Sequence, residues 1–436
     1  MKDYKRCFEK VIGYESIKEE LYQQLDLLSY PEKYKKLSGK LEKGIILVGQ
    51  PGVGKTLIAS CYIKAVEELG YKSFIVRKNL HDDKFIEHLN EVFEKAKLES
   101  KAIILLDDID KYMSCQNNEV FSVLQTLIDE VNESTVVIAT CNNVYDIHKS
   151  LLRPGRLGYR INLDLPNKED ARSIIKYYLS DKKLANDVDI EEIRRYLDGN
   201  SIATLENVMN RAGVYAGYEK SEVINTQHIL KAFLRVLYKT TPNFTEDDSK
   251  DLKAIATHEA SHAVAMEILD PGSVTLLSVL KHGNKNTNVK GLTIYDRKES
   301  KDLTEASTMK HKVIAYLAGK VGTELFLGDE DAGCCADVTR AFSLLREYVN
   351  QNSSLDYAYS TEFDDDEIRD VDLLTRQDIA IQTMIKNYSI IARKILVANR
   401  ELVMKLTDAL LKYKTINYKQ IAEIKSTCNV VEPELI

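Results

Sequence analysis

Short apolar runs and stretches of helical periodicity alternate along the first third of the chain. The apolar runs cover residues 44–48, 73–76, 103–106, 136–140 and 161–165. Strands this short and this uniformly apolar are typical of a parallel sheet, because helices bury both of its faces. The pattern predicts an α/β subdomain over residues 1–166.

Helical periodicity replaces the strand pattern from residue 168 to residue 238. Apolar residues recur there at the spacing of one helix face, as in Leu205, Val208, Met209 and Ala212. A polar segment with a proline at 239–244 then breaks the pattern. We expect a small helical subdomain at 167–238 and a linker at 239–247.

The remainder, residues 248–436, is predicted to form a mostly helical domain. Residues 245–248 have the spacing of a helix capping box, which would open this domain. A β-hairpin is expected between Val274 and Tyr295. The acidic stretch at 362–367 is expected to be a solvated loop.

The length of the chain predicts the number of domains, and its charge disfavours some classes of binding partner. A chain of 436 residues exceeds the size at which one hydrophobic core stops growing, so two or three domains are expected. The hydrophobic content of 44% is ordinary for a globular protein, and the net charge is −7. A negative chain gives no electrostatic basis for binding nucleic acid or an anionic membrane surface.

Neither a membrane helix nor a secretion signal is apparent in the sequence. No apolar run approaches the roughly 18 residues that a membrane helix needs, and no apolar segment follows the N-terminus. The seven cysteines have no paired spacing, which fits a reducing compartment better than a disulfide framework. We therefore expect a cytoplasmic protein, with no membrane association encoded in this chain.

The segment at 49–56 fits the pattern of a phosphate-binding loop. Its glycines permit a turn that aims backbone N–H groups at a phosphate, at the start of a helix whose dipole favours anions. Lys55 can reach the β- and γ-phosphates, and Thr56 can ligate Mg²⁺. The apolar run before the loop and the helical run after it disfavour an ordinary glycine turn. The nucleotide contacts that we expect here come from Gly49, Gly52, Val53, Gly54, Lys55, Thr56 and Leu57.

Two carboxylates, Asp107 and Asp108, directly follow the apolar run at 103–106. At a strand end beside a phosphate loop, Asp107 would hold Mg²⁺ and Asp108 would orient the attacking water. A plain solvated turn is the alternative interpretation. The loop upstream disfavours it, because that loop requires such a partner.

The segment His258-Glu259-Ala260-Ser261-His262 fits a zinc metalloprotease signature. Residues four apart share a helix face, so both histidines can bind one ion while Glu259 acts as general base. Core or surface histidines are the alternative, but the apolar residues on both sides favour a buried site. A catalytic zinc takes three protein ligands, so the two histidines need a third.

These motifs together resemble the cytosolic part of the FtsH-type AAA+ proteases, from about residue 8 to about residue 425. The resemblance implies an α/β AAA+ module with a parallel sheet and a helical lid, followed by a mostly α-helical, zincin-like peptidase domain. It also implies that Ile12 and Gly13 pack against adenine. Asn142 stands at the sensor position beside the γ-phosphate, and Arg156 stands at the arginine finger.

The resemblance also nominates the third zinc ligand. Asp337 lies within 333–339, which is similar to the aspartate-bearing helix of the family. Cys334 and Cys335 are rival soft ligands for zinc, which we interpret as small packing residues. The segment at 289–295 resembles the strand at the edge of the cleft, which could bind substrate by strand addition.

Three positions depart from the family pattern. Asp108 stands where the family has a glutamate, which predicts slow hydrolysis of ATP. Tyr159 replaces a second arginine, so Arg156 alone is carried over. The segment at 78–85 is shorter and more polar than the aromatic, glycine-bearing pore loop of the family.

The sequence therefore predicts an ATP-dependent zinc metalloendopeptidase that uses Zn²⁺, ATP and Mg²⁺. ATP hydrolysis would unfold or deliver protein substrates, with Glu259, Asp108 and Arg156 as catalytic residues. A homohexamer is expected, because an arginine finger acts on the ATP of a neighbour. The alternatives are an ATP-gated zinc peptidase with weak or no translocation, and a non-proteolytic remodelling module.

Overall fold

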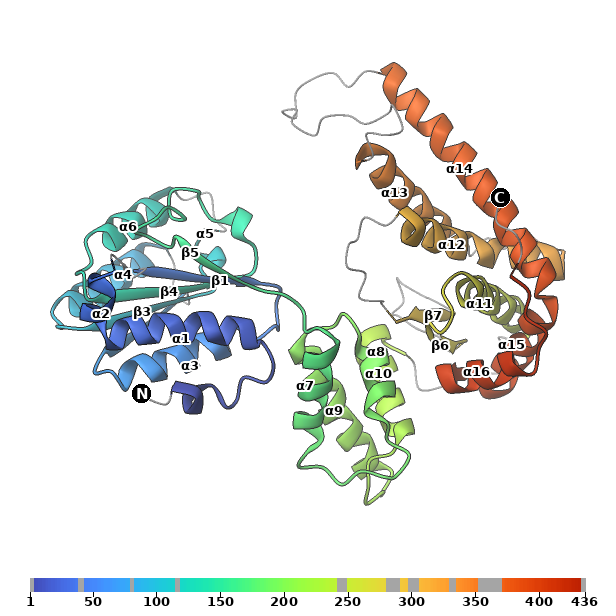
Figure 1. Cartoon of the computed structure of the whole chain (residues 1–436), viewed down its shortest axis with the longest axis horizontal. Helices are drawn as coiled ribbons and strands as arrows, with labels where there is room; N and C mark the ends of the chain where they lie inside the picture. The colour runs from blue at the N-terminus through green and yellow to red at the C-terminus, as the bar shows by residue number, and fades with distance from the viewer. Residues whose placement is uncertain are drawn as a thin grey trace. The chain divides into compact units, whose positions relative to one another are not determined.

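The computed structural model of the chain describes residues 4–37, 43–78, 82–113, 118–240, 249–279, 291–296, 306–328, 335–351 and 371–432. The chain forms two compact units, Met1–Ala232 and Phe233–Ile436 (Figure 1). Each unit contains its own clusters of buried apolar side chains. The expected order, an α/β part followed by a mostly helical part, is confirmed.

The first unit is built on a five-stranded parallel sheet with the strand order β2-β3-β4-β1-β5. All five predicted strands are present. They are β1 (Gly44–Gly49), β2 (Lys72–Arg77), β3 (Ala102–Asp107), β4 (Thr135–Cys141) and β5 (Tyr159–Leu163). The strand β5 begins earlier than predicted, because Tyr159 and Arg160 pair with Ile45 and Ile46 of β1.

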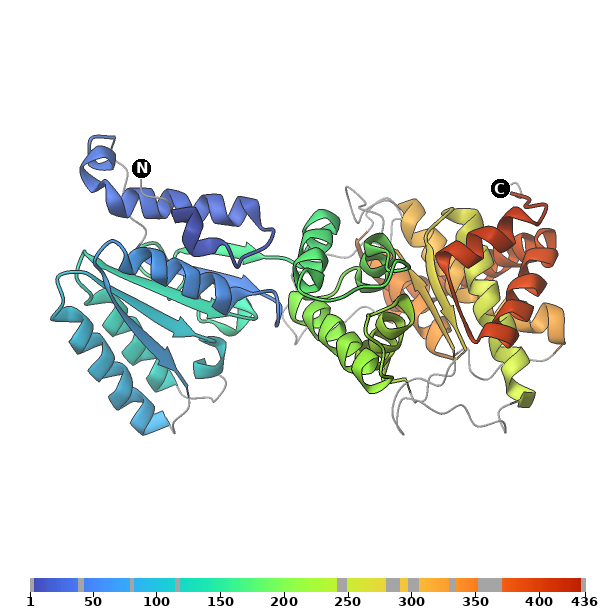
Figure 2. The same cartoon turned by 90° about the horizontal axis from the view of Figure 1, so that it is seen from below.

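Helices cover both faces of this sheet (Figure 2). Successive residues of β1 point to opposite faces, so Ile45 packs with one layer of helices and Ile46 with the other. The first layer holds α1 (Glu15–Ser29) and α3 (Lys55–Glu67), and the second holds α4 (Asp82–Lys97) and α6 (Asn118–Asp129). The short elements of this part are η1 (Tyr4–Phe8), α2 (Pro31–Lys35), α5 (Asp110–Met113) and η2 (Val144–Asp146).

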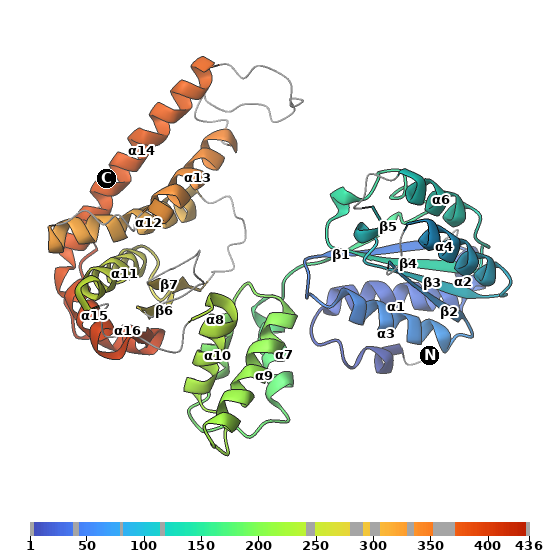
Figure 3. The same ribbon diagram turned by 180° about the vertical axis from the view of Figure 1, so that it is seen from behind.

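Four helices follow the sheet: α7 (Lys168–Leu179), α8 (Ile190–Leu197), α9 (Ile202–Tyr218) and α10 (Thr226–Tyr238) (Figure 3). The predicted apolar face of α9 is buried. Ser201 caps α9, since its side chain accepts from the N–H of Thr204. Two residues after Ser201, Ala203 donates its N–H to the carbonyl of Gly52 at 3.0 Å. This hydrogen bond connects the start of α9 to the phosphate loop.

The second unit is mostly helical around a three-stranded antiparallel sheet with the order β7-β6-β8. Its helices are α11 (Ser249–Leu269), α12 (Ala306–Leu327), α13 (Cys335–Gln351), α14 (Val371–Ala398), α15 (Arg400–Tyr413) and α16 (Tyr418–Ser426). Its strands are β6 (Val274–Ser278), β7 (Leu292–Tyr295) and β8 (Thr415–Asn417). The expected pairing of Val274 with Tyr295 is confirmed. The predicted capping box at 245–248 and the acidic stretch at 362–367 lie outside the described residues.

Helix α11 lies at the centre of this unit and packs against α12 and α15. Ala256, Ala260 and Ala263 are fully buried, and such small side chains allow neighbouring helices to approach closely. At the far end of α11, the buried Glu267 forms an ion pair with Lys425 of α16 at 2.8 Å. Among the helices that the structure describes, none combines the length and apolar character that crossing a membrane requires.

Candidate nucleotide and metal sites

The loop at 49–56 connects β1 to α3, as its motif requires. Gly52 and Gly54 have φ values of 82° and 96°, a region that glycine enters without strain. Lys55 turns back over the loop, and its Nζ donates to the carbonyls of Gly49 at 2.7 Å and Gln50 at 3.0 Å. Burial lowers the pKa of Lys55, and the neighbouring carboxylates counteract this shift.

Asp107 ends β3 and collects donors from three elements. Its Oδ1 accepts from Thr56 Oγ1 at 3.1 Å and from Thr140 Oγ1 at 2.8 Å. Its Oδ2 lies 3.2 Å from Nε of Arg77. The structure thus brings Thr56 and Asp107 together as the sequence predicts. Thr140 and Arg77 were not predicted to contact Asp107. They lie near it because β4 and β2 are the neighbours of β3 in the sheet.

The second carboxylate, Asp108, occupies the left-handed region of backbone conformation with φ of 54°. Its Oδ2 pairs with Nζ of Lys111 at 2.5 Å. Asn142 accepts from Lys55 Nζ at 2.9 Å and donates from Nδ2 to Asp110 Oδ2 at 2.8 Å. Sequence reasoning missed Asp110, although it stands two residues after Asp108 at the same strand end.

A pocket beside the phosphate loop has mostly apolar walls. Ile12, Val53 and Leu57 line it together with residues of α7 and α9. Gly13 lies next to these walls with φ of 75°, and a Cβ there would meet Oδ1 of Asp170 at 2.4 Å. The predicted adenine-packing residues therefore lie beside the predicted phosphate loop. Tyr177 and Tyr178 of α7 also line the pocket and were not predicted.

Arg156 lies outside this network and contacts residues of its own chain. Its Nε and Nη2 form a bidentate ion pair with Asp129 of α6, at 2.7 Å each. Its Nη1 donates to the carbonyl of Ser150 at 2.8 Å. Tyr159, at the position of the second family arginine, contacts Oε2 of Glu20 through its hydroxyl at 3.2 Å.

The segment at 78–85 is described only in part, because residues 79–81 lie outside the described residues. Helix α4 begins at Asp82, and Phe85 on it is fully buried. Phe85 packs edge-on against Tyr112. This aromatic side chain therefore belongs to the core and not to a surface loop.

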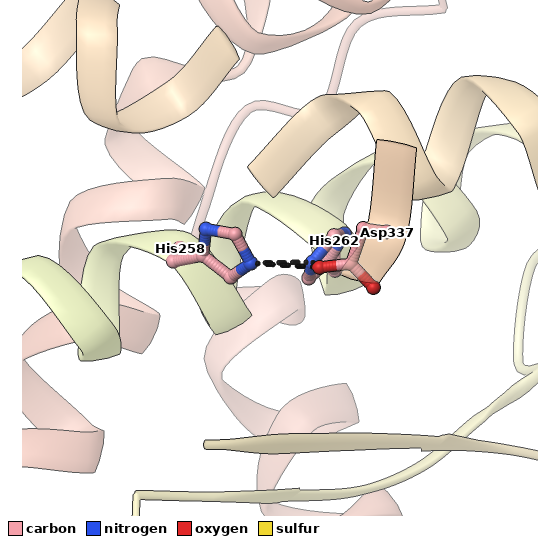
Figure 4. Close-up of side chains that lie close together, drawn as sticks. All are labelled: His258, His262 and Asp337. Atoms are coloured by element: carbon pink, nitrogen blue, oxygen red, sulfur yellow. Dashed lines mark hydrogen bonds and ion pairs between the residues drawn. The ribbon is translucent and has the colours of Figure 1, made fainter. Parts of the chain in front are cut away.

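The second site forms where α13 meets α11. Successive turns of α11 carry His258 and His262, and Asp337 lies in the first turn of α13 (Figure 4). Oδ2 of Asp337 lies 3.2 Å from Nε2 of His258 and 3.4 Å from Nε2 of His262. The two Nε2 atoms are 2.9 Å apart. Within the described residues, these three side chains form the one group of three or more His, Cys, Asp or Glu residues that could hold a metal ion.

Three observations fit this group to a zinc ion. Nδ1 of His262 lies 2.6 Å from the carbonyl of Ala315, so Nδ1 carries the proton and the lone pair of Nε2 faces Asp337. Gly319 of α12 leaves room at the centre, since a Cβ there would lie 2.5 Å from Nε2 of His262. Two imidazoles and one carboxylate form a ligand set that leaves a fourth zinc position open.

The charge state of Asp337 also fits metal binding. Burial acts to raise the pKa of this carboxyl, but the contacts with His258 and His262 outweigh burial and hold the pKa well below its usual range. The carboxylate is therefore ionised at neutral pH, as a metal ligand must be.

Glu259 lies beside the histidines with its side chain buried. Its Oε2 accepts from Thr293 Oγ1 of β7 at 2.5 Å. Burial raises the pKa of Glu259, against the lowering effect of His262 and His258. Sequence reasoning missed Thr293, because its contact with Glu259 depends on how β7 packs against α11.

Our interpretation of the two cysteines as packing residues is wrong for Cys335. This thiol is exposed at the start of α13, where it cannot pack into the core. It is also absent from the His258, His262 and Asp337 group. Cys334 and the start of the predicted cleft strand, residues 289–290, lie outside the described residues.

Comparison with known proteins assigns both parts of the chain. Residues 45–165 match the ATPase family associated with various cellular activities (AAA), and residues 245–424 match peptidase family M41. The predicted fold class, an AAA+ module followed by a peptidase domain, is confirmed.

Relatives named "ATP-dependent zinc metalloprotease FtsH" align over most of the chain. One from Aster yellows witches'-broom phytoplasma is 27% identical over 96% of this chain and 64% of its own length. Another from Lachnoclostridium phytofermentans is 30% identical over 92% of this chain and 71% of its own length. The chain thus spans less than two thirds of the phytoplasma relative. With the nucleotide and metal motifs both matched, this chain belongs to the FtsH family of AAA+ zinc metalloproteases.

Proposed function

We propose that this chain is an ATP-dependent zinc metalloendopeptidase that degrades protein substrates. The observation that carries the proposal is the convergence of His258, His262 and Asp337 beside the buried carboxylate of Glu259. The family's usual cofactors, Zn²⁺, ATP and Mg²⁺, are consistent with the donor groups at the two sites.

His258, His262 and Asp337 would hold the zinc ion. When bound, the zinc supplies a Lewis acid that polarises the scissile carbonyl and the attacking water. Glu259 accepts the proton of that water and then donates it to the leaving amine. The raised pKa of Glu259 suits both halves of this transfer, since a carboxyl group with a higher pKa is a stronger base and still a usable acid.

We infer that the substrate binds along β7. This strand is the outer strand of its sheet in the described part of the chain, with β6 on its other side. An extended peptide can add to such an edge through main-chain hydrogen bonds, which tolerate many side chains. Broad sequence specificity follows from that mode of binding.

In the first unit, Lys55 would bind the β- and γ-phosphates, and Thr56 and Asp107 would hold Mg²⁺. Asn142 would sense the γ-phosphate, and Asp108 would orient the water. The apolar pocket beside Ile12 and Gly13 would take the adenine. The helical subdomain at 167–238 would form the lid next to this pocket. The linker at 239–247 would then lead to the peptidase domain.

Arg156 would act on the ATP of a neighbouring subunit, which requires a ring, and we propose a homohexamer. We also propose a cytoplasmic location. The five cysteines within the described residues, Cys7, Cys61, Cys141, Cys335 and Cys428, are free thiols, as a reducing compartment favours.

Degradation of casein in ATP, in ADP and without nucleotide tests this function. We expect zinc-dependent cleavage that is fastest in ATP, and none in Glu259→Gln, which should stay folded and metal-loaded. Equal cleavage in all three conditions would instead indicate a peptidase that does not translocate. A wild-type protein that hydrolyses ATP without cleaving any substrate would indicate a remodelling module.

A further inference from the structure

A buried carboxylate needs hydrogen-bond donors, and Glu259 obtains one from an unexpected element. Thr293 of β7 donates from Oγ1 to Oε2 of Glu259 at 2.5 Å. The same hydroxyl lies 3.4 Å from the backbone carbonyl of Glu259. The hydroxyl thus contacts both the side chain and the main chain of Glu259, which restricts where the carboxylate can lie.

The alternation of β7 places further residues on the same side. Side chains two apart in a strand share a face, so Thr293 and Tyr295 lie on one side of β7, and Gly291, directly before the strand, precedes them at the same spacing. A Cβ at Gly291 would lie 2.2 Å from Oε1 of Glu259, so the carboxylate fills the space that a side chain would occupy. Tyr295 continues this face and packs against the core that surrounds α11.

The two carboxylate oxygens therefore have different surroundings. Oε2 is held by Thr293, while Oε1 lies against the backbone of Gly291. A general base needs one oxygen directed at the water and free to take its proton. The contact with Thr293 fixes the rotation of the carboxylate, which leaves Oε1 for this task.

We propose that Thr293 is a positioning residue for the general base: its hydroxyl orients Glu259 so that Oε1 accepts the proton of the attacking water. Gly291 provides the space for this orientation. The inference rests on the proposed peptidase function and extends it, because it makes β7 part of the catalytic machinery.

The matched pair Thr293→Val and Thr293→Ser tests the inference. Valine keeps the branched shape without the hydroxyl, and serine keeps the hydroxyl. With a short fluorogenic peptide and the full chain, we expect Thr293→Val to lower kcat by about 10- to 100-fold, a part of what a general base contributes. KM and zinc content should change little, and Thr293→Ser should recover most of kcat.

Binding of a peptide hydroxamate, measured by calorimetry, gives a readout without turnover. A hydroxamate chelates the metal and places its acidic proton beside the general base, so it also reports how the carboxylate is oriented. We expect Thr293→Val to weaken this binding by about three- to tenfold, the range of one hydrogen bond. In the Glu259→Gln background the same substitution should have no further effect, because Thr293 acts through Glu259.

Each outcome separates the inference from the proposed function. Zinc and hydroxamate binding with an unchanged kcat in Thr293→Val would overturn the inference alone. An equal loss in Thr293→Ser and Thr293→Val, or an effect that persists in the Glu259→Gln background, would also overturn it by indicating a purely structural role. A wild-type chain that binds neither zinc nor the hydroxamate would overturn the peptidase function and this inference together.

Discussion

At the scale of single residues, the candidate metal centre depends on one oxygen. Oδ2 of Asp337 contacts both His258 and His262, so its loss leaves two imidazoles without their shared partner. We expect Asp337→Ala to weaken zinc binding by more than about 100-fold, since even the outer partners of metal ligands contribute 10- to 100-fold. Competition with a chelator of known affinity measures this change.

The matched control for this prediction is Cys335→Ser. The thiol is exposed and does not belong to the ligand group, so this variant should keep both zinc and peptidase activity. If Cys335→Ser lost its zinc while Asp337→Ala kept it, the assignment of Asp337 would be wrong.

Spacing along the sequence identified those residues of the candidate metal site that lie on one helix, but not those that come from other elements. His258 and His262 lie four apart on one helix, so the sequence alone pairs them. Asp337 follows much later on another helix, and only the family resemblance nominated it. Thr293 lies in the segment at 289–295 that the resemblance placed at the cleft edge, but nothing in the sequence pairs it with Glu259, because that contact arises from the packing of a strand on a helix. Such a contact has no fixed spacing along the chain.

At the scale of elements, α12 contributes to the candidate metal centre because Gly319 has no side chain. A Cβ at Gly319 would lie 2.5 Å from Nε2 of His262 and 2.6 Å from Cε1 of His258. These are ring atoms of buried side chains, which cannot easily move aside. We expect Gly319→Ala to abolish zinc binding although alanine is the better helix former, by about 1 kcal/mol. Metal analysis of the purified variant measures the loss.

Gly217→Ala provides the control for that prediction. Gly217 also lies in a helix, in the last turn of α9, but a Cβ there meets nothing within 4 Å. This substitution should raise the free energy of unfolding by up to about 1 kcal/mol and leave zinc content unchanged. Zinc retained at wild-type level in Gly319→Ala would show that α12 can shift away from the histidines.

The elements themselves were largely predictable, because their apolar periodicity is a local property. The parallel strands and the buried face of α9 follow directly from it. The start of β5 does not, because Tyr159 and Arg160 join the strand through their pairing with β1. The exposure of Cys335 could not be predicted either, because the sequence around a cysteine at the start of a helix does not indicate whether its thiol is buried or exposed to solvent.

At the scale of the whole molecule, Arg156 links the structure to assembly. Its guanidinium is held by Asp129 and the carbonyl of Ser150 in its own chain, away from Lys55 and Asp107. An arginine finger would have to act across an interface between subunits. In the proposed ring of identical chains each interface would be heterologous, so one chain would supply Lys55 and its neighbour would supply Arg156.

Mixing two inactive variants tests this arrangement. We expect Lys55→Ala to lose nucleotide binding while it keeps Arg156, and Arg156→Ala to keep Lys55 while it lacks the proposed finger. In an equal random mixture, about one interface in four joins an intact Lys55 to an intact Arg156. We therefore expect the mixture to regain about a quarter of the wild-type ATPase rate, while each variant alone is inactive.

Mixing Lys55→Ala with Asp107→Ala should regain nothing, because both lesions lie in the same half of the interface. Recovery in that control, or none with Arg156→Ala, would contradict action across the interface and leave the contact with Asp129 as the role of Arg156.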